Sequence, residues 1–509
     1  MNNTIDVLFI SNSNKFNNYQ DLSVNLSACE PPTWALLLAQ SCRAVGFNPK
    51  ILDISAENLS IDESISRIFD LNPRLLCFVV YGQNVNAGSA NMTNNVELSE
   101  KLKNIDCKIP ISYVGSHVQA LPRATLINEP SIDFVFMNEG VYALRNILSL
   151  DSIDVNNLEN IKGIAWRKND EIVINDPEII VPNEKMDIDL PGYAWDLLPY
   201  KNQPFDLYSS PLWHAEYIEE NRSPYASIQT SLGCQFNCSF CMINMINRND
   251  TEEVGVASNY NKMRYWSPEF IFNEFKKLYD YGVRTIKITD EMFLLNKKYY
   301  EPLCHLLAES GMGEELRMWA YSRVDTVRNP ELLKLIKSAG IKWLALGIES
   351  SNKKVRLEVT KGKFEDVDVE KVVRQIEDVG IQVIANYMFG LPGETLDTMK
   401  NTLDFSIDLN TAAWNAFPAI ALPGSKLYKE SLNNNQIVPK NYEEFSFLGR
   451  KTIPLYNELL TRKQILQYRD FAFSAYHSNP KFIEKIRNLF GEKAVNSINE
   501  MLKTKMIRD

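Results

Sequence analysis

The 509-residue chain contains few cysteines and few histidines, 8 and 4 respectively. Five of the cysteines are scattered, and we expect them to be reduced and mostly buried, as in a cytoplasmic protein. No run of about 18 apolar residues occurs, so the sequence predicts no membrane span. The N-terminus also lacks the basic stretch and the long apolar run of a signal peptide, which again indicates a cytoplasmic location.

Positive charge is scarcer than negative charge, with 54 Lys and Arg residues against 64 Asp and Glu residues. The resulting net charge of −10 argues against a nucleic-acid-binding surface. The hydrophobic share of 45% is ordinary for a globular protein. The length implies about two to four domains.

Residues 1–150 alternate apolar strands with helical patterns, which predicts a doubly wound, Rossmann-like α/β domain. Strands are expected at residues 5–11, 50–54, 75–81, 111–115 and 134–137. Helices are expected at residues 34–45, 60–69, 96–103 and 141–148. Such a domain binds its ligand beyond the C-terminal ends of its strands. No G-x-G-x-x-G sequence follows the first strand, so a dinucleotide ligand is not expected.

Residues 151–220 are expected to connect this domain to a second one. Residues 163–167 and 171–175 flank a short polar turn and predict a hairpin. Residues 182–211 are rich in proline, aspartate and aromatic side chains. So many aromatic residues argue against free disorder, and we expect an ordered linker that packs on both domains.

Strand–helix alternation resumes over residues 221–435, which predicts a partial (β/α)6 barrel of the TIM type with its chemistry at the C-terminal strand ends. Strands are expected at residues 225–230, 285–290, 318–322, 343–347, 382–388 and 414–420. Residues 436–509 are expected to form a helical C-terminal segment, with amphipathic helices at 462–476 and 481–502. These helices are either a packing appendix or a lid over the active site.

Three cysteines lie within eight residues, Cys234, Cys238 and Cys241, with the spacing C-x3-C-x2-C. Three thiolates can hold three corners of a cubane iron–sulfur cluster and leave the fourth iron open to a substrate. The same spacing also describes one face of a helix. Zinc is a further alternative, but it would need a fourth ligand and no histidine is nearby.

The cysteine sequence follows the strand-like run 225–230, and Phe240 precedes its last cysteine. Together these features resemble the radical S-adenosylmethionine (radical SAM) enzymes. The resemblance implies an oxygen-sensitive [4Fe–4S] cluster on the three cysteines, which are then the metal-binding and catalytic residues. It also implies that the open iron binds the methionine part of SAM, that Phe240 lies beside SAM, and that an electron donor such as flavodoxin or ferredoxin reduces the cluster.

Further segments in the expected order strengthen the resemblance. Asp290 and Glu291 end the second barrel strand, and we expect Asp290 to face inward and receive the methionine ammonium, with Glu291 as a less certain partner. Arg323 lies in Ser-Arg-Val-Asp after the third strand and is expected to clamp the carboxylate bidentately, although a salt bridge with Asp325 is the plainer explanation. The resemblance implies further SAM contacts from Ser322, Gly347, Glu349 and Ser350.

A doubly wound domain ahead of this core resembles the cobalamin-binding module of B12-dependent radical SAM proteins. The resemblance implies that cobalamin contacts come from strand-end residues, namely Ser11, Gln83, Asn84, Ser89, Gly115 and His117. The D-x-H-x-x-G sequence that supplies a cobalt ligand in other cobalamin proteins is absent, because Gly115 stands where it has aspartate. We therefore expect His117 to be a loop histidine that is hydrogen-bonded to backbone, and not a cobalt ligand.

The combined resemblance implies a cobalamin-dependent radical SAM methyltransferase that acts on an unactivated carbon of a small-molecule substrate through a 5′-deoxyadenosyl radical. A non-methylating oxidoreductase or cyclase of the same group is an alternative. A non-catalytic corrinoid or iron–sulfur carrier or sensor is another. Aromatic residues at the barrel mouth either line an apolar substrate pocket or pack in the core, namely Trp319, Tyr321, Tyr387, Phe389 and Trp414.

Overall fold

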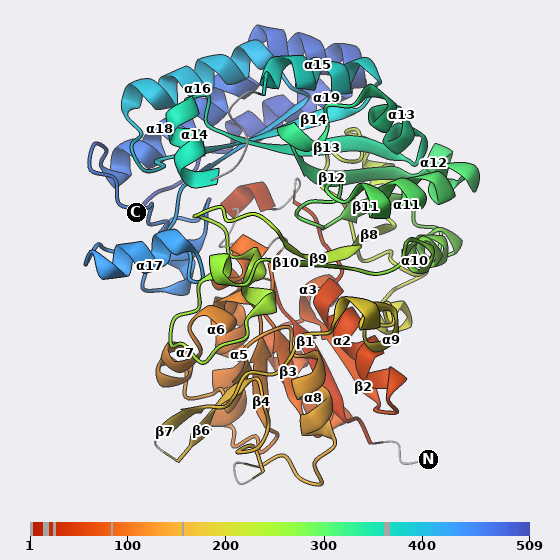
Figure 1. The fold of residues 1–509 in the computed structure, drawn as a ribbon, viewed down its shortest axis with the longest axis vertical. Helices are drawn as coiled ribbons and strands as arrows, with labels where there is room; N and C mark the ends of the chain where they lie inside the picture. Colours follow the sequence, from red (N-terminus) through yellow and green to blue (C-terminus); the bar gives the residue numbers. More distant parts are fainter. Residues whose placement is uncertain are drawn as a thin grey trace.

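The structure is a computed structural model that describes residues 4–13, 20–23, 27–82, 85–154, 157–169, 171–360 and 367–509. Two α/β units are stacked along the long axis of the molecule, the N-terminal unit below and the second unit above (Figure 1). In the described part of the chain, no helix has the length and apolar character that a membrane crossing requires.

The N-terminal unit is built on one seven-stranded sheet with the order β2-β1-β3-β4-β5-β6-β7. Its strands are β1 (Val7–Ser11), β2 (Pro49–Asp53), β3 (Leu76–Val79), β4 (Ile111–Val114), β5 (Phe134–Phe136), β6 (Ile164–Lys168) and β7 (Glu171–Ile174). The first five are parallel, as predicted. The predicted hairpin forms β6 and β7, and β6 pairs antiparallel with β5. The hairpin therefore enlarges this sheet beyond the five strands that the sequence predicted.

Helices cover both faces of the sheet, which explains why its central strands are apolar on both sides. The helices are α2 (Thr33–Ala44), α3 (Ile54–Glu57), α4 (Ile61–Leu71), α5 (Met92–Asn104), α6 (Ser116–Ala120), α7 (Pro122–Asn128) and α8 (Val141–Leu148). Alternate residues of β1 show the two faces: Val7 and Phe9 pack with α2 and α8, whereas Leu8 and Ile10 pack with α4 and α5. Ser60 begins α4 with a capping box, since its hydroxyl accepts from the Glu63 amide.

The described part of the connecting segment contacts both units and contains one short α-helix, α9 (Met186–Asp189). The rings of Tyr193 and Trp195 stack at 4.4 Å. The Trp195 indole donates to Glu274 in the second unit at 2.9 Å. Asp196, the next residue, bonds Arg43 on α2.

The second unit is a six-stranded parallel sheet with the order β15-β14-β13-β12-β11-β8, which confirms the partial barrel. Its strands are β8 (Tyr225–Ile228), β11 (Thr285–Ile288), β12 (Arg317–Arg323), β13 (Ile341–Glu349), β14 (Gln382–Phe389) and β15 (Ala413–Pro418). Its helices are α10 (Pro268–Asp280), α11 (Lys297–Glu309), α12 (Met312–Glu315), α13 (Pro330–Ser338), α14 (Lys353–Thr360), α15 (Val369–Asp378) and α16 (Leu396–Leu409). Helices lie along the outer face of this curved sheet in Figure 1.

A two-stranded antiparallel ribbon was not predicted. It pairs β9 (Ser231–Cys234) with β10 (Lys262–Tyr265), and Cys234 is its last residue on β9. Each strand has four residues, and a long loop separates them, so neither shows the alternation or the adjacent turn that marks a hairpin in sequence. The ribbon therefore holds the backbone at the beginning of the cysteine segment.

The C-terminal helices are α17 (Lys426–Asn433), α18 (Arg462–His477) and α19 (Pro480–Lys503), the last kinked at Gly491. Tyr476 of α18 stacks on Trp414 of β15 at 5.3 Å, and Phe490 of α19 stacks on Trp343 of β13 at 5.7 Å. Both helices thus pack on the barrel sheet. Neither helix contributes a residue to the wall of the cavity described below, so their packing on the barrel accords with the packing appendix of the two alternatives.

Candidate active site

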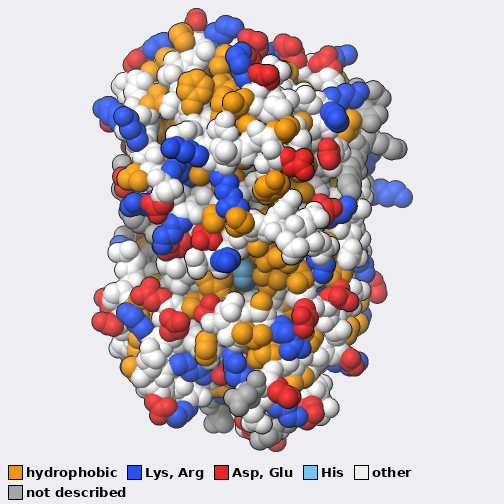
Figure 2. All heavy atoms as spheres, turned by 90° about the vertical axis from the view of Figure 1, so that its left-hand side faces the viewer, with side chains coloured by type: hydrophobic (Ala, Val, Ile, Leu, Met, Phe, Trp, Pro, Cys, Tyr) orange, Lys and Arg blue, Asp and Glu red, His pale blue; other side chains and the backbone are white. Residues whose placement is uncertain are grey.

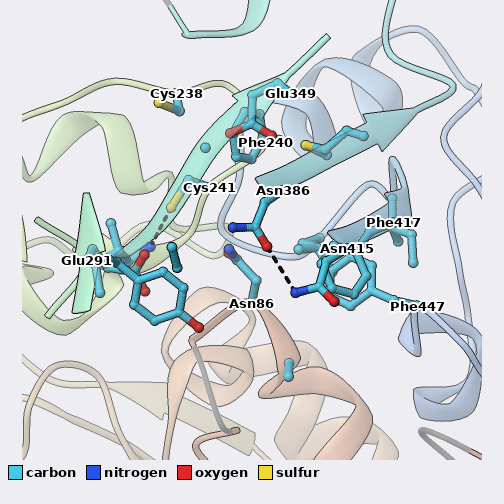
Figure 3. A pocket seen from close by; sticks show the side chains of 18 of the residues that line it. Asn86, Cys238, Phe240, Cys241, Glu291, Glu349, Asn386, Asn415, Phe417 and Phe447 are labelled. Atoms are coloured by element: carbon cyan, nitrogen blue, oxygen red, sulfur yellow. Dashed lines mark hydrogen bonds between the residues drawn. The ribbon is translucent and has the colours of Figure 1, made fainter. Parts of the chain in front are cut away.

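A cavity of about 290 Å3 opens where the two units meet, at the C-terminal ends of the barrel strands. The three predicted cluster cysteines line it, together with residues of β12 to β15 and of the loop after β11. Figure 3 shows Cys238, Cys241, Glu291 and Glu349 around this space. The cavity therefore lies at the C-terminal strand ends, where TIM-type barrels carry their chemistry.

The cysteine loop is held on three sides. The Cys234 amide donates to Asn244 Oδ1 at 2.9 Å. The Ser239 amide donates to the Val359 carbonyl of α14 at 2.9 Å, and the Ser239 carbonyl accepts from the Leu427 amide of α17 at 2.9 Å. These bonds fix the backbone between the cysteines, so the loop direction is set before any metal binds.

The three thiols fit a cluster better than a single ion. Within the described ranges, no three His, Cys, Asp or Glu side chains converge to hold one metal ion. In a cubane each thiolate binds a different iron, which needs a wider spacing. Burial raises the pKa of Cys234 to about 11 and that of Cys238 to about 12, so metal binding must displace the thiol protons.

The two neighbouring carboxylates have different surroundings, and the expectation for Asp290 is wrong. Asp290 is 2% exposed and accepts hydrogen bonds from the Thr230 amide at 2.6 Å, the Thr230 hydroxyl at 2.8 Å and the Ser231 hydroxyl. It ties the end of β11 to the turn between β8 and β9 and does not line the cavity. Glu291 lines the cavity instead. Burial raises the pKa of Glu291 to about 7, although the Lys287 ammonium opposes the shift.

Arg323 combines both explanations that the sequence allowed. Its guanidinium donates to both carboxylate oxygens of Asp325, at 3.0 and 3.2 Å, and it also lines the cavity. Its guanidinium carbon lies 4.0 Å from the centre of the Phe236 ring. Ser322 lines the cavity as well, and its hydroxyl is 2.8 Å from that of Thr326. The salt bridge therefore orients the guanidinium at the cavity wall.

Gly347 and Glu349 meet at the cavity wall, whereas Ser350 turns away. A Cβ at Gly347 would lie 2.7 Å from Glu349 Oε1, so this position has room for glycine alone unless the Glu349 side chain moves. Glu349 adopts a φ of 63°, and burial raises its pKa to about 7. Ser350 is buried with its hydroxyl 3.2 Å from that of Thr402, and it does not line the cavity. Phe240 does line it.

The N-terminal unit contributes the loop between β3 and α5 to the same cavity. Asn86, Ala87 and Ala90 line it, and Asn86 Oδ1 accepts from the Met242 amide at 3.2 Å. The small alanine side chains leave this wall open to a flat ring. Of the predicted contacts in this loop, Gln83 and Asn84 lie outside the described residues.

Other predicted cobalamin contacts are near this loop but do not line the cavity. His117 is 5% exposed, and its Nδ1 lies 2.9 Å from the Ser89 hydroxyl, so its partner is a side chain and not the predicted backbone. Burial lowers the pKa of His117 to about 4, which keeps the imidazole neutral. Ser11 ends β1. A Cβ at Gly115 would lie 2.6 Å from Val80 Cγ2, which gives Gly115 a packing role.

Several cavity residues were missed by sequence reasoning. They are Asn386, Asn415, Phe417 and the segment 445–448. Asparagine is unfavourable within a strand, so its presence within β14 and β15 was a usable signal. The segment 445–448 is far from the barrel in sequence, and no local pattern connects it to the site. Of the aromatic residues named at the barrel mouth, Tyr321 and Tyr387 line the cavity, whereas Trp319 and Trp414 are packed among other buried rings.

Comparisons with known proteins agree with both parts of the site. The family model described as the radical SAM superfamily matches residues 228–406, and the B12 binding domain matches residues 19–148. A protein of Pyrococcus horikoshii described as an uncharacterized methyltransferase is 25% identical over 460 residues, covering 89% of each chain. The anaerobic magnesium-protoporphyrin IX monomethyl ester cyclase of Cereibacter sphaeroides is 21% identical over 88% of this chain and 67% of its own length.

Among solved structures, the radical SAM methyltransferase TsrM of Kitasatospora setae, with cobalamin and a [4Fe–4S] cluster bound, superposes with a TM-score of 0.66. The match covers 98% of this chain and 100% of TsrM at 15% identity, so it shows a shared fold. The predicted cofactors, a [4Fe–4S] cluster, SAM and cobalamin, are those of the two matched domains. The chain therefore combines a B12-binding domain with a radical SAM domain.

Proposed function

We propose that this protein is a cobalamin-dependent methyltransferase that methylates an unactivated carbon of a small-molecule substrate. One observation carries the proposal: a single cavity is lined by Cys234, Cys238 and Cys241 and also by Asn86, Ala87 and Ala90 of the N-terminal unit. A group bound by the first unit and a group bound by the cysteines could therefore both reach one substrate. The relatives described as methyltransferases support this choice.

When bound, the cofactors supply a 5′-deoxyadenosyl radical for hydrogen abstraction and a methyl group for transfer. The chain's own residues hold and orient them. Arg323 presents a guanidinium fixed by Asp325, which suits the methionine carboxylate. Glu291 lines the cavity and suits the methionine ammonium. Gly347 leaves close access to backbone, and Glu349 lies where it could accept from ribose hydroxyls.

The proposal also assigns a role to each part of the chain. Residues 1–150 hold cobalamin, and residues 151–220 connect the units, although their hairpin also extends the first sheet. Residues 221–435 form the radical SAM core. Residues 436–509 support the core and supply the cavity segment 445–448. An electron donor such as flavodoxin or ferredoxin reduces the cluster.

The principal alternative is a cyclase or another non-methylating oxidoreductase, because the cyclase of Cereibacter sphaeroides matches most of this chain. A non-catalytic carrier fits less well, since a carrier needs no pocket for SAM. Anaerobic incubation of reconstituted protein with a cell extract and SAM labelled in its methyl group separates the possibilities. Methyl transfer gives a labelled product by mass spectrometry, a cyclase gives deoxyadenosine without label transfer, and a carrier gives neither.

Cluster assembly and cobalamin binding are tested separately. Reconstituted protein should hold about four irons per chain. Changing Cys234, Cys238 and Cys241 to alanine should abolish both the iron and deoxyadenosine formation. If that triple variant still cleaves SAM, the cluster assignment is wrong.

Cobalamin should be retained without a histidine ligand to cobalt, because His117 is engaged with Ser89. The paramagnetic resonance spectrum of the Co(II) form should show no nitrogen splitting that depends on His117. Splitting that disappears in His117→Ala would reassign this histidine as a ligand. Protein that retains no corrinoid at all would exclude the methyltransferase proposal.

A further inference from the structure

Charge is unevenly distributed around the cavity. Among the described residues that line it, the charged side chains are Glu291, Arg323 and Glu349, which lie at or beyond the ends of β11, β12 and β13. The wall formed by β14, β15 and the segment 445–448 is uncharged. SAM carries an ammonium, a carboxylate and a sulfonium, so the charged wall suits SAM. The uncharged wall is left for another molecule.

Two asparagine side chains form the polar part of this uncharged wall. Asn386 on β14 and Asn415 on β15 are register partners, and Asn415 Nδ2 donates to Asn386 Oδ1 at 3.2 Å (Figure 3). Asn386 Nδ2 donates to the carbonyls of Leu346 and Ile384, both at 3.3 Å. These backbone bonds determine which end of the Asn386 amide is the acceptor. Asn386 therefore orients Asn415.

Asn415 retains hydrogen-bonding capacity on the cavity side. In the described part of the chain, the Asn415 side chain forms one hydrogen bond, to Asn386, which uses one of its two N–H groups. An asparagine side chain has two donors and one carbonyl acceptor. One N–H and the carbonyl oxygen remain on the same planar group. An amide with a free donor and a free acceptor can pair with another amide.

Aromatic rings flank this edge. Phe417 lies two residues after Asn415 on β15, and therefore on the same face of the sheet. The ring centres of Phe417 and Phe447 are 5.2 Å apart with a tilt of 56°. Figure 3 places both rings beside Asn415, on the side of the cavity away from Cys238 and Cys241. The wall is thus an amide edge within an apolar, aromatic surface.

We propose that this wall recognises the substrate, and that the substrate is an uncharged molecule with a carboxamide or lactam edge on a flat apolar body. The inference rests on the proposed function and specifies its substrate class. An amide edge would pair with Asn415 while its body packs on Phe417 and Phe447. A carboxylate in the same place would meet the Asn415 carbonyl oxygen and would lose its hydration without a cation to replace it, which is costly.

The test uses indole-3-carboxamide and indole-3-carboxylate as probes, which differ in charge but hardly in shape. Their dissociation constants are measured anaerobically by saturation-transfer NMR on holoenzyme with cluster, Co(III) cobalamin and saturating SAM. We expect the carboxamide to bind at least about tenfold more tightly, since sites built on hydrogen bonds reject analogues that cannot form them. Asn415→Leu should remove this preference and leave SAM affinity unchanged. Asn433→Leu, at an exposed position of α17, is the matched control.

Three results would overturn the inference. Equal or tighter binding of the carboxylate excludes an uncharged substrate class, and binding of neither probe excludes the subsite. Weaker SAM binding in Asn415→Leu would assign the amide edge to the adenine of SAM, which offers a similar donor and acceptor pair.

A second variant distinguishes loss of the subsite from misfolding of the protein. Asn415→Asp keeps the shape and should shift preference to the cationic indole-3-carboxamidine. An Asn415→Asp protein with native thermal unfolding and no such shift also overturns the inference. Deoxyadenosine and methyl transfer are measured on the same preparations. If wild-type protein prefers the carboxamide but forms neither deoxyadenosine nor a methylated product, the proposed function is refuted and the subsite is not.

Discussion

Asp290 and Glu291 are neighbours in the sequence, but their side chains have different surroundings. The Asp290 carboxylate accepts hydrogen bonds from Thr230 and Ser231, so it stabilises the strand ends that surround the site. Glu291 faces the cavity. The sequence identified the acidic pair but not which member faces inward, because the chain leaves β11 at this point and the alternation of a strand no longer applies.

Exchanging each charged group separately tests these roles. Arg323→Ala and Glu291→Gln should each weaken SAM binding, because loss of a charged partner in a buried site costs about 2–5 kcal/mol. Iron content should stay unchanged. Asp290→Asn should lower thermal stability and leave the SAM affinity of folded protein near that of wild type. Equilibrium dialysis against labelled SAM gives the affinities, and unchanged affinity in Arg323→Ala would remove Arg323 from the SAM site.

Glu394 is a buried carboxyl in the turn after β14. Its Oε2 accepts from the amides of Gly390 at 2.7 Å and Leu391 at 3.0 Å, and so holds the turn after β14. Burial raises its pKa from 4.5 to about 7 despite these bonds. Because the folded protein holds this proton more tightly than the unfolded chain, its contribution to stability falls as pH rises between these two values.

Glu394→Gln should remove that pH dependence. The free energy of unfolding of wild type relative to Glu394→Gln should decrease from pH 4.5 to pH 8 by roughly 3 kcal/mol, which is the pKa difference expressed as energy. Below the unfolded pKa both side chains are neutral and the difference should be flat. Urea titrations across this range measure it, with Glu458→Gln at an exposed position as control. A difference that does not vary with pH would show that Glu394 titrates normally.

At the scale of elements, the cavity segment 445–448 depends on both ends of the chain. Gln20 donates to the carbonyls of Leu448 at 2.7 Å and Ile507 at 3.2 Å and accepts from the Ile507 amide at 3.0 Å. Arg508 donates to Asp470 on α18 through two bonds of 3.0 and 2.9 Å, and to the Gly449 carbonyl at 2.8 Å. A turn from the first unit and the C-terminal tail thus hold one wall of the site.

Arg508→Ala should loosen this wall. Asp470 would keep its other partner, Arg469, so we expect a modest global cost of about 1–3 kcal/mol for the lost charged hydrogen bonds. The local effect should be larger, with faster amide hydrogen exchange over residues 445–452. Lys505→Ala, at an exposed position in the same tail, is the matched control. Equal exchange in the two variants would show that Arg508 does not hold the segment.

The sequence predicted elements whose pattern is local. All six barrel strands and the five parallel strands of the first sheet were found, because buried strands appear as short apolar runs between turn signals. It missed the ribbon of β9 and β10, whose strands are short and far apart along the chain. The sequence predicted α18 and α19 as helices but not the surface that they cover, because an amphipathic pattern does not identify the element against which a helix packs.

At the scale of the whole molecule, the site exists because two units face each other. The cysteines and Arg323 were expected at the site from their spacing, their order and the family resemblance, and they line the cavity. The segment 445–448 was not expected there, because it reaches the cavity through contacts that no local sequence pattern shows. Figure 2 shows hydrophobic side chains gathered at mid-height of the molecule, near the level where the two units meet, between regions with charges of both signs.

A buried ion pair joins the two units. Lys287 on β11 is 2% exposed and donates to both oxygens of Glu30, at 3.0 and 3.2 Å. Glu30 belongs to the N-terminal unit and precedes α2. The Lys287 ammonium also lies 5.1 Å from the centre of the Trp319 ring. Breaking a buried pair at one end leaves an uncompensated charge, whereas replacing both ends by neutral groups does not.

Glu30→Gln alone should therefore destabilise the protein by about 3–5 kcal/mol, and Glu30→Gln with Lys287→Met should recover much of that loss. Thermal unfolding followed by calorimetry measures both variants. Asp196→Asn is the matched control, because the Arg43–Asp196 bridge also joins the first unit to later sequence but is exposed, and such bridges contribute about 1 kcal/mol or less. If the single and double variants melt together, the two units are held by apolar packing and not by this pair. If the double variant is stable but retains no corrinoid, the pair sets how the two units face each other.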